Sequence, residues 1–230
     1  MKFRIGWLAA GVFGRKFGVY CLFAVGLFAA AIERTHAAIE VVAATGDNLP
    51  DGNGQLALHY APTINAAGQI AFVSDLTGTA GGTADDQVVL RRDTSGGLAI
   101  IARKGETYAG QPIDLFYPPV ANIDADGTVA PMIAVGPPTV LHHAFGEGGA
   151  LTPMYTMGSP SPSGNNTLAA VLNAAINDAG LSVFRALYTG AAPETGLYQR
   201  ALDGTITTRL LRNAPLPRGG RSTGLVVGPR

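Results

Sequence analysis

The sequence predicts an all-β protein: a propeller-like array of about three four-stranded antiparallel blades with partial flanking strands, preceded by an N-terminal hydrophobic signal helix. Two observations support this fold class. The chain carries 31 Gly and 15 Pro in 230 residues, so turns are frequent between short apolar runs, as in all-β proteins. Two short motifs also recur along the chain at the same spacing, which indicates a repeat architecture.

The first motif has an apolar residue, then Asn or Asp, and Gly three positions later. It occurs at 64–72, 123–131 and 176–184. A type I turn favours Asn or Asp at its first position and Gly at its fourth, where φ is often positive. We therefore expect each copy to form a turn that starts a strand. In the second copy Pro131 replaces Phe and cannot donate to a sheet ladder, so the middle unit is expected to be the least regular.

The second motif is a short apolar run that ends at Gly46, Gly105 and Gly158, with a degenerate fourth copy at 210–215. These glycines are 59 and 53 residues apart, and the Asn or Asp positions of the first motif have the same two spacings. Two independent motifs with the same unequal spacing indicate a true repeat. Its period is slightly above that of typical propeller blades.

Four strands are expected in each of three units, which span about 56–104, 113–157 and 167–212. Residues 167–173 would also suit a short helix by propensity, and their place in the repeat favours a strand. Four antiparallel strands per period is the composition of a propeller blade. The expected strands are 56–60, 69–74, 87–92 and 98–103 in the first unit, 113–117, 128–135, 139–143 and 150–155 in the second, and 167–173, 181–187, 196–200 and 205–211 in the third.

The flanks predict two further strands, at 39–44 and 223–227. Both would leave unpaired sheet edges, which proteins usually cover or blunt. Three explanations stay open: a truncated piece of a longer repeat protein, self-association through the open edges, or an open arc. The repeat domain, 38–230, is therefore predicted to be incomplete at its C-terminus.

The N-terminus resembles an export signal. A basic stretch ending at Arg15 and Lys16 precedes sixteen uncharged, mostly apolar residues, 17–32, and small residues follow, with a possible peptidase site after Ala37. This order is typical of a signal peptide, here 1–37, and predicts a periplasmic, cell-surface or extracellular protein. The alternative is an uncleaved membrane anchor, although a span usually needs about 20 residues.

Charge and cysteine content limit the partners. Five basic residues and one acidic residue give the first 37 positions a charge of +4, and the remaining 11 basic and 15 acidic residues give −4. The body of the chain therefore lacks the basic excess of a nucleic-acid binder. Membrane contact is expected only through the N-terminal segment. Cys21 is the only cysteine and lies in the leader, so the body has neither a disulfide nor a thiolate metal site.

The turn motif resembles the tandem Asn-x-x-Gly-x-x-Ala-Phe repeat for which a family of exported bacterial proteins is named. Residues 65–72 match that pattern at all four defined positions, and 101–106 fit the companion motif of the same family. Val183, Asp124 and Pro131 depart from the pattern. The resemblance covers about 39–230. It implies export and propeller-like repeats, and it implies no catalytic residue.

One stretch resembles the first half of a calcium loop. Asn122, Asp124 and Asp126 supply oxygens at alternate positions, with Gly127 at the sixth. The twelfth position is Ile133, so the usual bidentate carboxylate is missing, and the other units do not repeat the acids. A plain turn is therefore the favoured interpretation.

The adjacent residues His142 and His143 would face opposite sides of a strand, so they could not easily chelate one ion. His59, distant in sequence, could approach them in a sheet stack, but the spacing does not favour zinc. We expect one of the pair at the surface and the other half-buried.

The remaining candidates are more simply explained as loop or surface residues than as parts of a site. No nucleophile elbow or nucleotide-binding glycine pattern is present, and Ser159–Ser163 falls in a loop. The body contains no Trp, which weakens a carbohydrate platform, although four tyrosines remain. The paired charges are expected to be solvated or solubilising. The four tyrosines are Tyr60, Tyr108, Tyr117 and Tyr188. The paired charges are Asp85 with Asp86, Arg91 with Arg92, and Arg103 with Lys104.

The sequence thus favours an exported, non-enzymatic repeat protein that acts as a structural or binding module at the cell surface or outside. No catalytic, cofactor or metal residue is predicted, and neither a cofactor nor a particular partner. The alternative is a metal-dependent binder or hydrolase on the same scaffold, with a site built from Asn122, Asp124, Asp126 and His142. A truncated fragment of a longer repeat protein is the third possibility.

Overall fold

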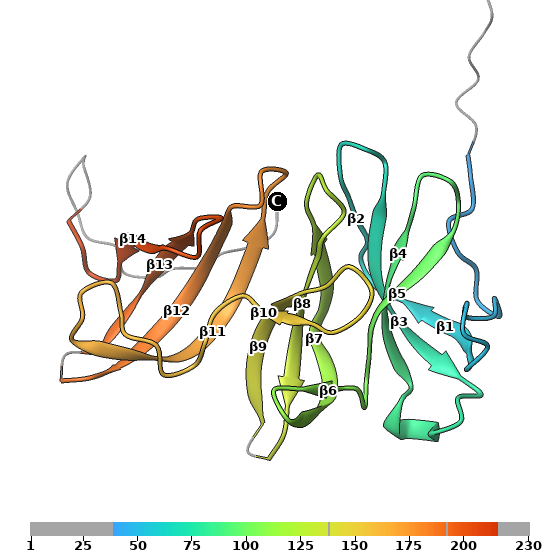
Figure 1. The fold of residues 1–230 in the computed structure, drawn as a ribbon, viewed down its shortest axis with the longest axis horizontal. Coiled ribbons are helices and arrows are strands. Elements are labelled where there is room, and N and C mark those ends of the chain that lie inside the picture. Colours follow the sequence, from blue (N-terminus) through green and yellow to red (C-terminus); the bar gives the residue numbers. More distant parts are fainter. Residues whose placement is uncertain (1–38, 138, 192, 216–230) are drawn as a thin grey trace, which may run out of the picture. The chain divides into compact units, whose positions relative to one another are not determined.

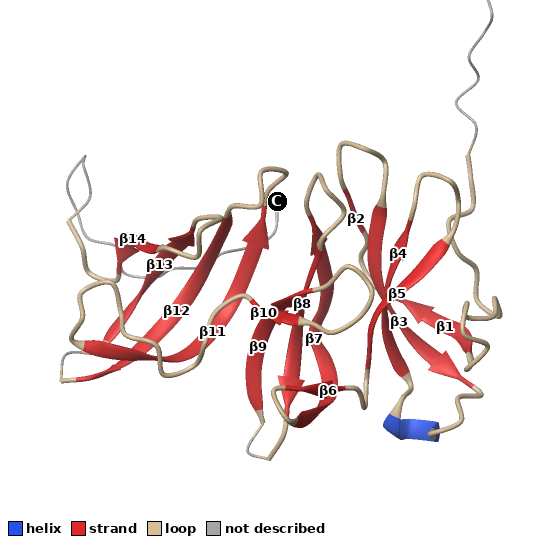
Figure 2. Cartoon of the chain, viewed as in Figure 1, coloured by secondary structure: helices blue, strands red, loops and turns tan. Residues whose placement is uncertain are grey.

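The computed structural model describes residues 39–137, 139–191 and 193–215. Almost all of them belong to one compact unit, Val41–Arg230. This part of the chain is all-β, as predicted, and its only helical element is the single 3-10 turn η1, Gly82–Ala84 (Figures 1 and 2). No helix among the described residues is long and apolar enough to cross a membrane. The predicted signal peptide and the predicted strand at 223–227 lie outside the described residues.

The strands form three antiparallel sheets that follow one another along the chain (Figure 1). The first sheet has the order β1-β3-β4-β5, with β2 paired to β3; the second has the order β10-β9-β8-β7-β6; the third has the order β11-β12-β13-β14. The strand bounds are β1 Gln55–His59, β2 Thr63–Ile64, β3 Ile70–Thr77, β4 Gln87–Arg92, β5 Leu98–Arg103, β6 Thr107–Tyr108, β7 Gln111–Ile123, β8 Val129–Val135, β9 Val140–Phe145, β10 Thr152–Pro153, β11 Asn166–Ile176, β12 Ser182–Gly190, β13 Glu194–Arg200 and β14 Ile206–Leu211.

Most strand predictions are confirmed, and two are wrong. β4 and β5 have the predicted bounds, and the ambiguous segment 167–173 is a strand within β11. Residues 39–44 form no strand: Val41 is 72% exposed, and Val42 and Ala43 pack on the apolar face of the first sheet instead of pairing with a strand. Of the expected strand 150–155, only β10 forms. Beyond it Met154 still donates to the His143 carbonyl at 3.0 Å, and the His143 N–H donates to the Tyr155 hydroxyl at 2.8 Å.

The first motif forms the same turn at three places. The N–H groups of Gly68, Gly127 and Gly180 donate to the carbonyls three residues earlier at 3.0, 3.2 and 2.9 Å, and their φ angles are 84°, 90° and 72°. The side-chain Oδ1 of each Asn or Asp accepts the N–H four residues later, at 2.9, 2.8 and 2.9 Å. β3, β8 and β12 begin directly after these turns, as predicted.

The second motif ties the segment before each sheet to β1, β7 or β11. The N–H groups of Gly46, Gly105 and Gly158 donate to Leu56, Ile113 and Leu168 carbonyls, each at 2.8 Å. In the fourth copy, 210–215, Asn213 takes the place of the glycine, because the Ala214 N–H donates to the Leu211 carbonyl as the Asp47 N–H donates to the Ala44 carbonyl. Asn213 adopts the left-handed conformation, with φ 66°, which Asn tolerates better than other non-glycine residues.

The middle sheet is irregular beside Pro131. β7 leaves its pairing with β8 between Phe116 and Ala121, whose partners are Ile133 and Pro131. Four residues of β7 therefore face one residue of β8. The bulge itself contains Pro118 and Pro119, which have no N–H to donate to a ladder. Pro131 interrupts the other side of β8: the ladder with β9 runs from Met132 to Val135, and beyond Pro131 only the isolated bridge of Val129 with Gly146 remains.

The core consists of three apolar clusters, two of which join neighbouring sheets. One joins the first and second sheets through residues such as Val73 and Phe116. Another joins the second and third sheets through Ala130 and Phe184. The third covers the other face of the first sheet, where Leu49 packs with neighbours that include Phe72 and Leu90.

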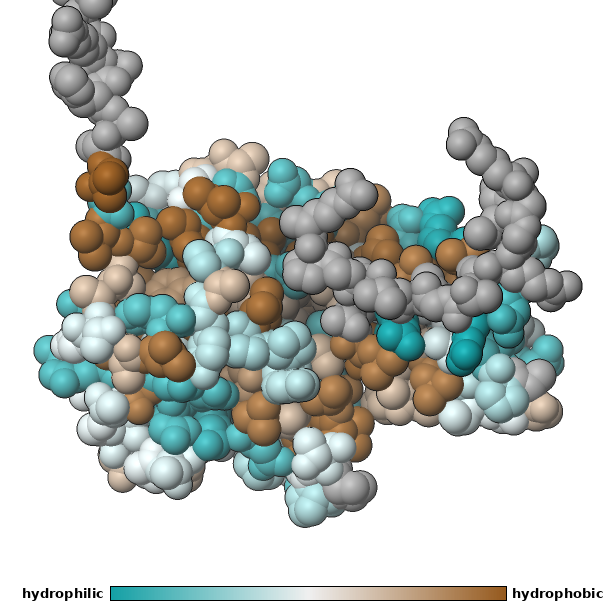
Figure 3. Space-filling view, turned by 180° about the vertical axis from the view of Figure 1, so that it is seen from behind, coloured by the Kyte–Doolittle hydropathy of each residue, from teal (hydrophilic) through white to brown (hydrophobic). Residues whose placement is uncertain are grey.

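Apart from Ile39 and Val41, the exposed large apolar side chains come from separate segments. Leu58, Ile64, Tyr117 and Leu202 are 55%, 68%, 59% and 72% exposed. On the face drawn in Figure 3, hydrophobic residues are interspersed with hydrophilic ones. Single apolar residues of this kind are ordinary on protein surfaces, so the polar contacts between the sheets carry more information about function.

We expect Gly105→Ala to destabilise the protein by about 1 kcal/mol or more beyond Gly46→Ala, measured by urea unfolding. Both glycines have positive φ, at 86° and 93°, and any L-residue there costs about 1–2 kcal/mol. A Cβ on Gly105 would lie 2.8 Å from the Ala84 carbonyl oxygen, whereas one on Gly46 would meet nothing within 4 Å. Equal losses in the two variants would contradict the close approach.

Candidate functional site

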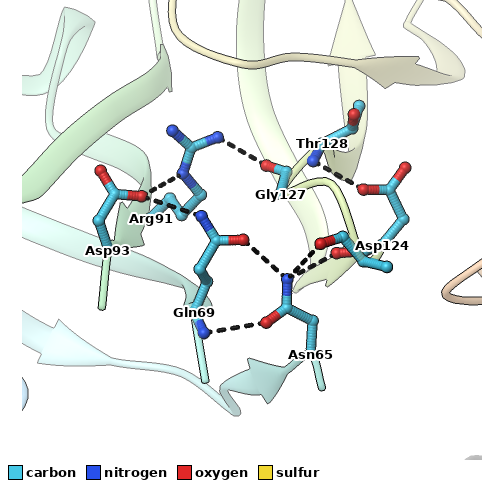
Figure 4. Close-up of polar contacts among 8 residues, drawn as sticks. Asn65, Gln69, Arg91, Asp93, Asp124, Gly127 and Thr128 are labelled. Atoms are coloured by element: carbon cyan, nitrogen blue, oxygen red, sulfur yellow. Dashed lines mark hydrogen bonds and ion pairs between the residues drawn. The ribbon is translucent and has the colours of Figure 1, made fainter. Parts of the chain in front are cut away.

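The best-defined polar site lies where the first turn meets the second. Asn65 is only 6% exposed. Its Oδ1 accepts the Gln69 N–H at 2.9 Å within its own turn, and its Nδ2 donates to the Asp124 carbonyl of the next turn at 2.7 Å (Figure 4). The same Nδ2 also lies 2.8 Å from Gln69 Oε1. One carboxamide therefore stabilises its own turn and joins two sheets.

Arg91 makes a second bond across the same junction. Its Nη1 donates to the Gly127 carbonyl at 2.6 Å, and its Nε pairs with Asp93 Oδ1 at 2.9 Å (Figure 4). Gln69 Nε2 also donates to Asp93 Oδ1, at 3.2 Å. The expectation that Arg91 is merely solubilising is wrong, because its partly buried guanidinium bridges the first sheet to the second turn.

A further contact recurs at the position two residues before the turn Asn or Asp, in the first and second turns. Thr63 Oγ1 donates to the Ala121 carbonyl at 2.5 Å, and Asn122 Nδ2 donates to the Ala174 carbonyl at 3.3 Å. Each donor lies two residues before its own turn, and each acceptor three residues before the next turn. The same geometry thus joins the first sheet to the second and the second to the third.

These bonds explain the calcium-like stretch. Asp124 is 7% exposed, and its Oδ1 accepts the Asp126 N–H at 3.1 Å and the Thr128 N–H at 2.8 Å. The Asn122 carboxamide is used in the contact with β11. Among the described residues, no group of three or more His, Cys, Asp or Glu side chains is placed to hold a metal ion.

The histidine pair is more deeply placed than expected. His143 is 3% exposed, and neither ring nitrogen has a hydrogen-bond partner. Burial, with a smaller contribution from the charge of His142, lowers the pKa of His143 to about 4. His142 is half-buried, with its ring 5.3 Å from that of Tyr108. His59 instead contacts Ser74 within the first sheet, Nδ1 to Oγ at 3.2 Å.

The expectation that Arg103 is solubilising is also wrong. It is 6% exposed, its Nη2 pairs with Asp51 Oδ2 at 2.8 Å and its Nη1 donates to the Asn53 carbonyl at 3.0 Å. Its position at the end of a strand did not indicate burial, because the covering loop comes from some 50 residues earlier in the chain. The Arg103 guanidinium therefore anchors the 51–53 loop to the first sheet.

The acidic pair beside Arg103 is not freely solvated. Asp86 pairs with Lys104 at 2.8 Å, and Asp85 accepts Asn53 Nδ2 at 2.9 Å. Hydrogen bonds from Thr79 and then Asn53 lower the pKa of Asp85. Of the four tyrosines considered for stacking, only Tyr117 is largely exposed, whereas Tyr108 and Tyr188 are buried at 4% and 0% exposure.

One hollow was not indicated by the sequence. It has a volume of about 360 Å³ and lies beside the start of β13. Glu194 on its rim accepts Ser163 Oγ at 2.7 Å and Asn166 Nδ2 at 3.1 Å. No motif contains Glu194, so only the folded chain could place it here. The lining residues are Pro193, Glu194, Thr195, Leu211, Arg212 and Asn213.

Comparisons with known proteins add one finding. The model of a family of unknown function (DUF7453) matches residues 22–124, a span that ends at the second turn. No curated protein and no solved structure matches the chain.

We expect Asn65→Asp to lower the free energy of unfolding by about 1–3 kcal/mol, the cost of leaving a buried polar group without its partner. The substitution keeps the Oδ1 acceptor of the turn and removes the Nδ2 donor to the Asp124 carbonyl. Asn177→Asp is the matched control, because Asn177 makes the same turn but is exposed. Its effect should stay within about 0.5 kcal/mol, and equal effects in chemical denaturation would refute the junction role.

We expect stability to fall between pH 6.5 and about pH 4. The unfolded state binds a proton on His143 below its ordinary pKa of 6.5, whereas the folded state resists protonation until its lowered pKa of about 4. Protonation therefore favours unfolding, by roughly 1 kcal/mol per pH unit.

The His143→Leu variant should show a shallower decline in denaturant titrations at pH 7, 6 and 5. An unchanged slope would rule out His143 as the group responsible.

Proposed function

We propose that this chain is an exported, non-enzymatic repeat protein with a propeller-like arrangement of blades, acting as a structural or binding module at the cell surface or outside. Its three four- or five-stranded antiparallel sheets each begin with the same glycine turn and contain the same Asn or Asp turn. Each would be one blade of the array.

The recurring junction bond is the observation that carries the proposal. Thr63 and Asn122, two residues before their turns, each donate to the equivalent carbonyl of the following sheet. A chain in which each unit contacts its neighbour in the same way fits a repeat protein, whose stability is the sum of units and interfaces. The polar residues of the motifs, including Asn65 and Asp124, are used in turns and junctions, which favours a structural role for them.

Export is supported by the N-terminal sequence. The basic residues up to Lys16, the apolar run 17–32 and the small residues before Ala38 have the order of a signal peptide. The body after this segment has a net charge of −4 and contains no cysteine, which is compatible with function outside the cytoplasm.

We expect the full chain, expressed in a bacterial host, to leave the cytoplasm and to lack residues 1–37 by intact mass. The double variant Arg15→Glu, Lys16→Glu should block export, because it removes the charge that precedes the apolar run. Cytoplasmic protein that keeps its first 37 residues would refute the export proposal.

The same purified protein tests the non-enzymatic part. Stoichiometric calcium that is lost in Asp126→Asn would contradict this part and favour the alternative metal-dependent binder or hydrolase. Asp126 suits this test because its side chain, unlike that of Asp124, does not accept the N–H groups that build the turn.

A further inference from the structure

The first and third sheets have a loop of the same form just before β1 and β11. In the first loop the Leu49 N–H donates to the Gly54 carbonyl at 3.1 Å. In the third sheet the Ser161 N–H donates to the Asn166 carbonyl at 2.7 Å, across the same number of residues. The two loops are therefore equivalent in the repeat, and their differences can be compared position by position.

The ion pair that anchors the first loop has no counterpart in the third sheet. Arg103 Nη2 pairs with Asp51 Oδ2 at 2.8 Å. Ser163 takes the place of Asp51, two residues after the start of the loop. Leu211 takes the place of Arg103, two residues before the positive-φ residue of the turn. Because leucine is shorter than arginine and uncharged, this exchange leaves space beside the start of β13, where the hollow of about 360 Å³ lies.

Asp86 and Glu194 occupy the same place in their sheets. The Leu76 N–H donates to the Asp86 carbonyl at 2.7 Å, and Tyr188 is paired with Glu194 across β12 and β13. Leu76 and Tyr188 each lie eleven residues after the turn Asn of their sheet. The carboxylates of the two acids are therefore equivalent.

The basic partners are equivalent as well. Lys104 and Arg212 each directly precede the positive-φ residue of their turn. Their N–H groups donate to the carbonyl of the residue after the acid, at 2.9 and 2.8 Å. In the first sheet Lys104 Nζ pairs with Asp86 Oδ1 at 2.8 Å. The third sheet thus keeps both charges of this pair, as Glu194 and Arg212.

The two charges of the third sheet do not meet. Glu194 and Arg212 both line the hollow, and neither forms an ion pair with any residue in the part of the chain that the structure describes. Glu194 Oε1 accepts Ser163 Oγ at 2.7 Å and Asn166 Nδ2 at 3.1 Å. Its Oε2 has a long contact of 3.5 Å with the Tyr198 hydroxyl. The carboxylate is thus fixed on one side and able to accept further donors on the other.

The second sheet shows that the turn does not require these charges. Val140 pairs with Val135, eleven residues after Asp124, and Met157 directly precedes Gly158. Both equivalent side chains are apolar, and Met157 packs against a core cluster. The repeat geometry alone therefore does not explain why Glu194 and Arg212 face one hollow.

We propose that this hollow binds a free α-amino acid, whose ammonium group donates to Glu194 and whose carboxylate accepts from Arg212. This inference names the ligand class of the binding module proposed above and rests on the same repeat. A guanidinium group matches a carboxylate with two parallel donors, and the hollow is within the range of about 300–1,000 Å³ of small-molecule sites. Pro193 and Leu211, also on its lining, supply apolar contact for the ligand's side chain.

NMR titration of the full chain with each of the twenty common amino acids tests this proposal. We expect at least one to bind with a stoichiometry of one. The N-acetyl and C-amide derivatives of that amino acid each lack one charge and should bind about tenfold more weakly, or worse. Absence of binding by all twenty, or equal binding of either derivative, would overturn the proposal.

Two variants place the ligand in the hollow. Glu194→Gln keeps an oxygen acceptor for Ser163 and Asn166 and removes the charge, and Arg212→Gln removes the guanidinium group. Each should weaken binding by about tenfold, with an unchanged urea midpoint to show that the fold is intact. Lys104→Gln, the same change at the equivalent position of the first sheet, is the matched control and should leave the affinity within about twofold. Parent-like binding by Glu194→Gln or Arg212→Gln would overturn the proposal.

The two proposals fail in different ways. If no amino acid binds while Asn65→Asp still destabilises the protein more than Asn177→Asp does, the ligand is refuted and the repeat interpretation stands. If Asn65→Asp and Asn177→Asp have the same effect, the repeat junction itself is refuted.

Discussion

The carboxamide of Asn65 is the contact on which the arrangement of the first two sheets depends. Its oxygen accepts within its own turn, and its nitrogen donates to the next turn. Because a carboxamide is both acceptor and donor, one side chain can serve both units, whereas a carboxylate at this position could serve only its own. Because Asn65 is buried, an unpaired amide there would cost free energy, and this cost favours the arrangement in which the amide donates to the next turn.

Asp124 shows the consequence of a missing side-chain donor. It builds its own turn through Oδ1 but cannot donate to the third turn. There the backbone N–H of Ala125 approaches the Asp178 carbonyl at 3.4 Å, and Asn122 supplies the side-chain bond. The second junction therefore relies on the position before the turn, and on an apolar cluster rich in aromatic rings, Tyr155, Phe184, Tyr188 and Tyr198. The first junction thus has more side-chain hydrogen bonds than the second, which relies more on apolar contacts.

Much of the local structure could be predicted, and little of the site. The Asn or Asp and Gly spacing predicted the turns and the strands that come after them, and β4 and β5 have the predicted bounds. The deep burial of His143 and Arg103 was not predicted, because burial depends on what a distant segment places against the side chain. Asn122 looked like a metal ligand because its spacing to Asp124 was visible, whereas its acceptor in β11, 52 residues later, was not.

The sequence by itself determined the turns, the strands and their order, because these depend on residues a few positions apart: Asn or Asp for the turn acceptor, and Gly for positive φ. The tertiary structure alone decided which side chains join the sheets and where Glu194 lies. Those outcomes depend on contacts between residues about 30 to 60 positions apart, and such contacts form only when the sheets pack against each other.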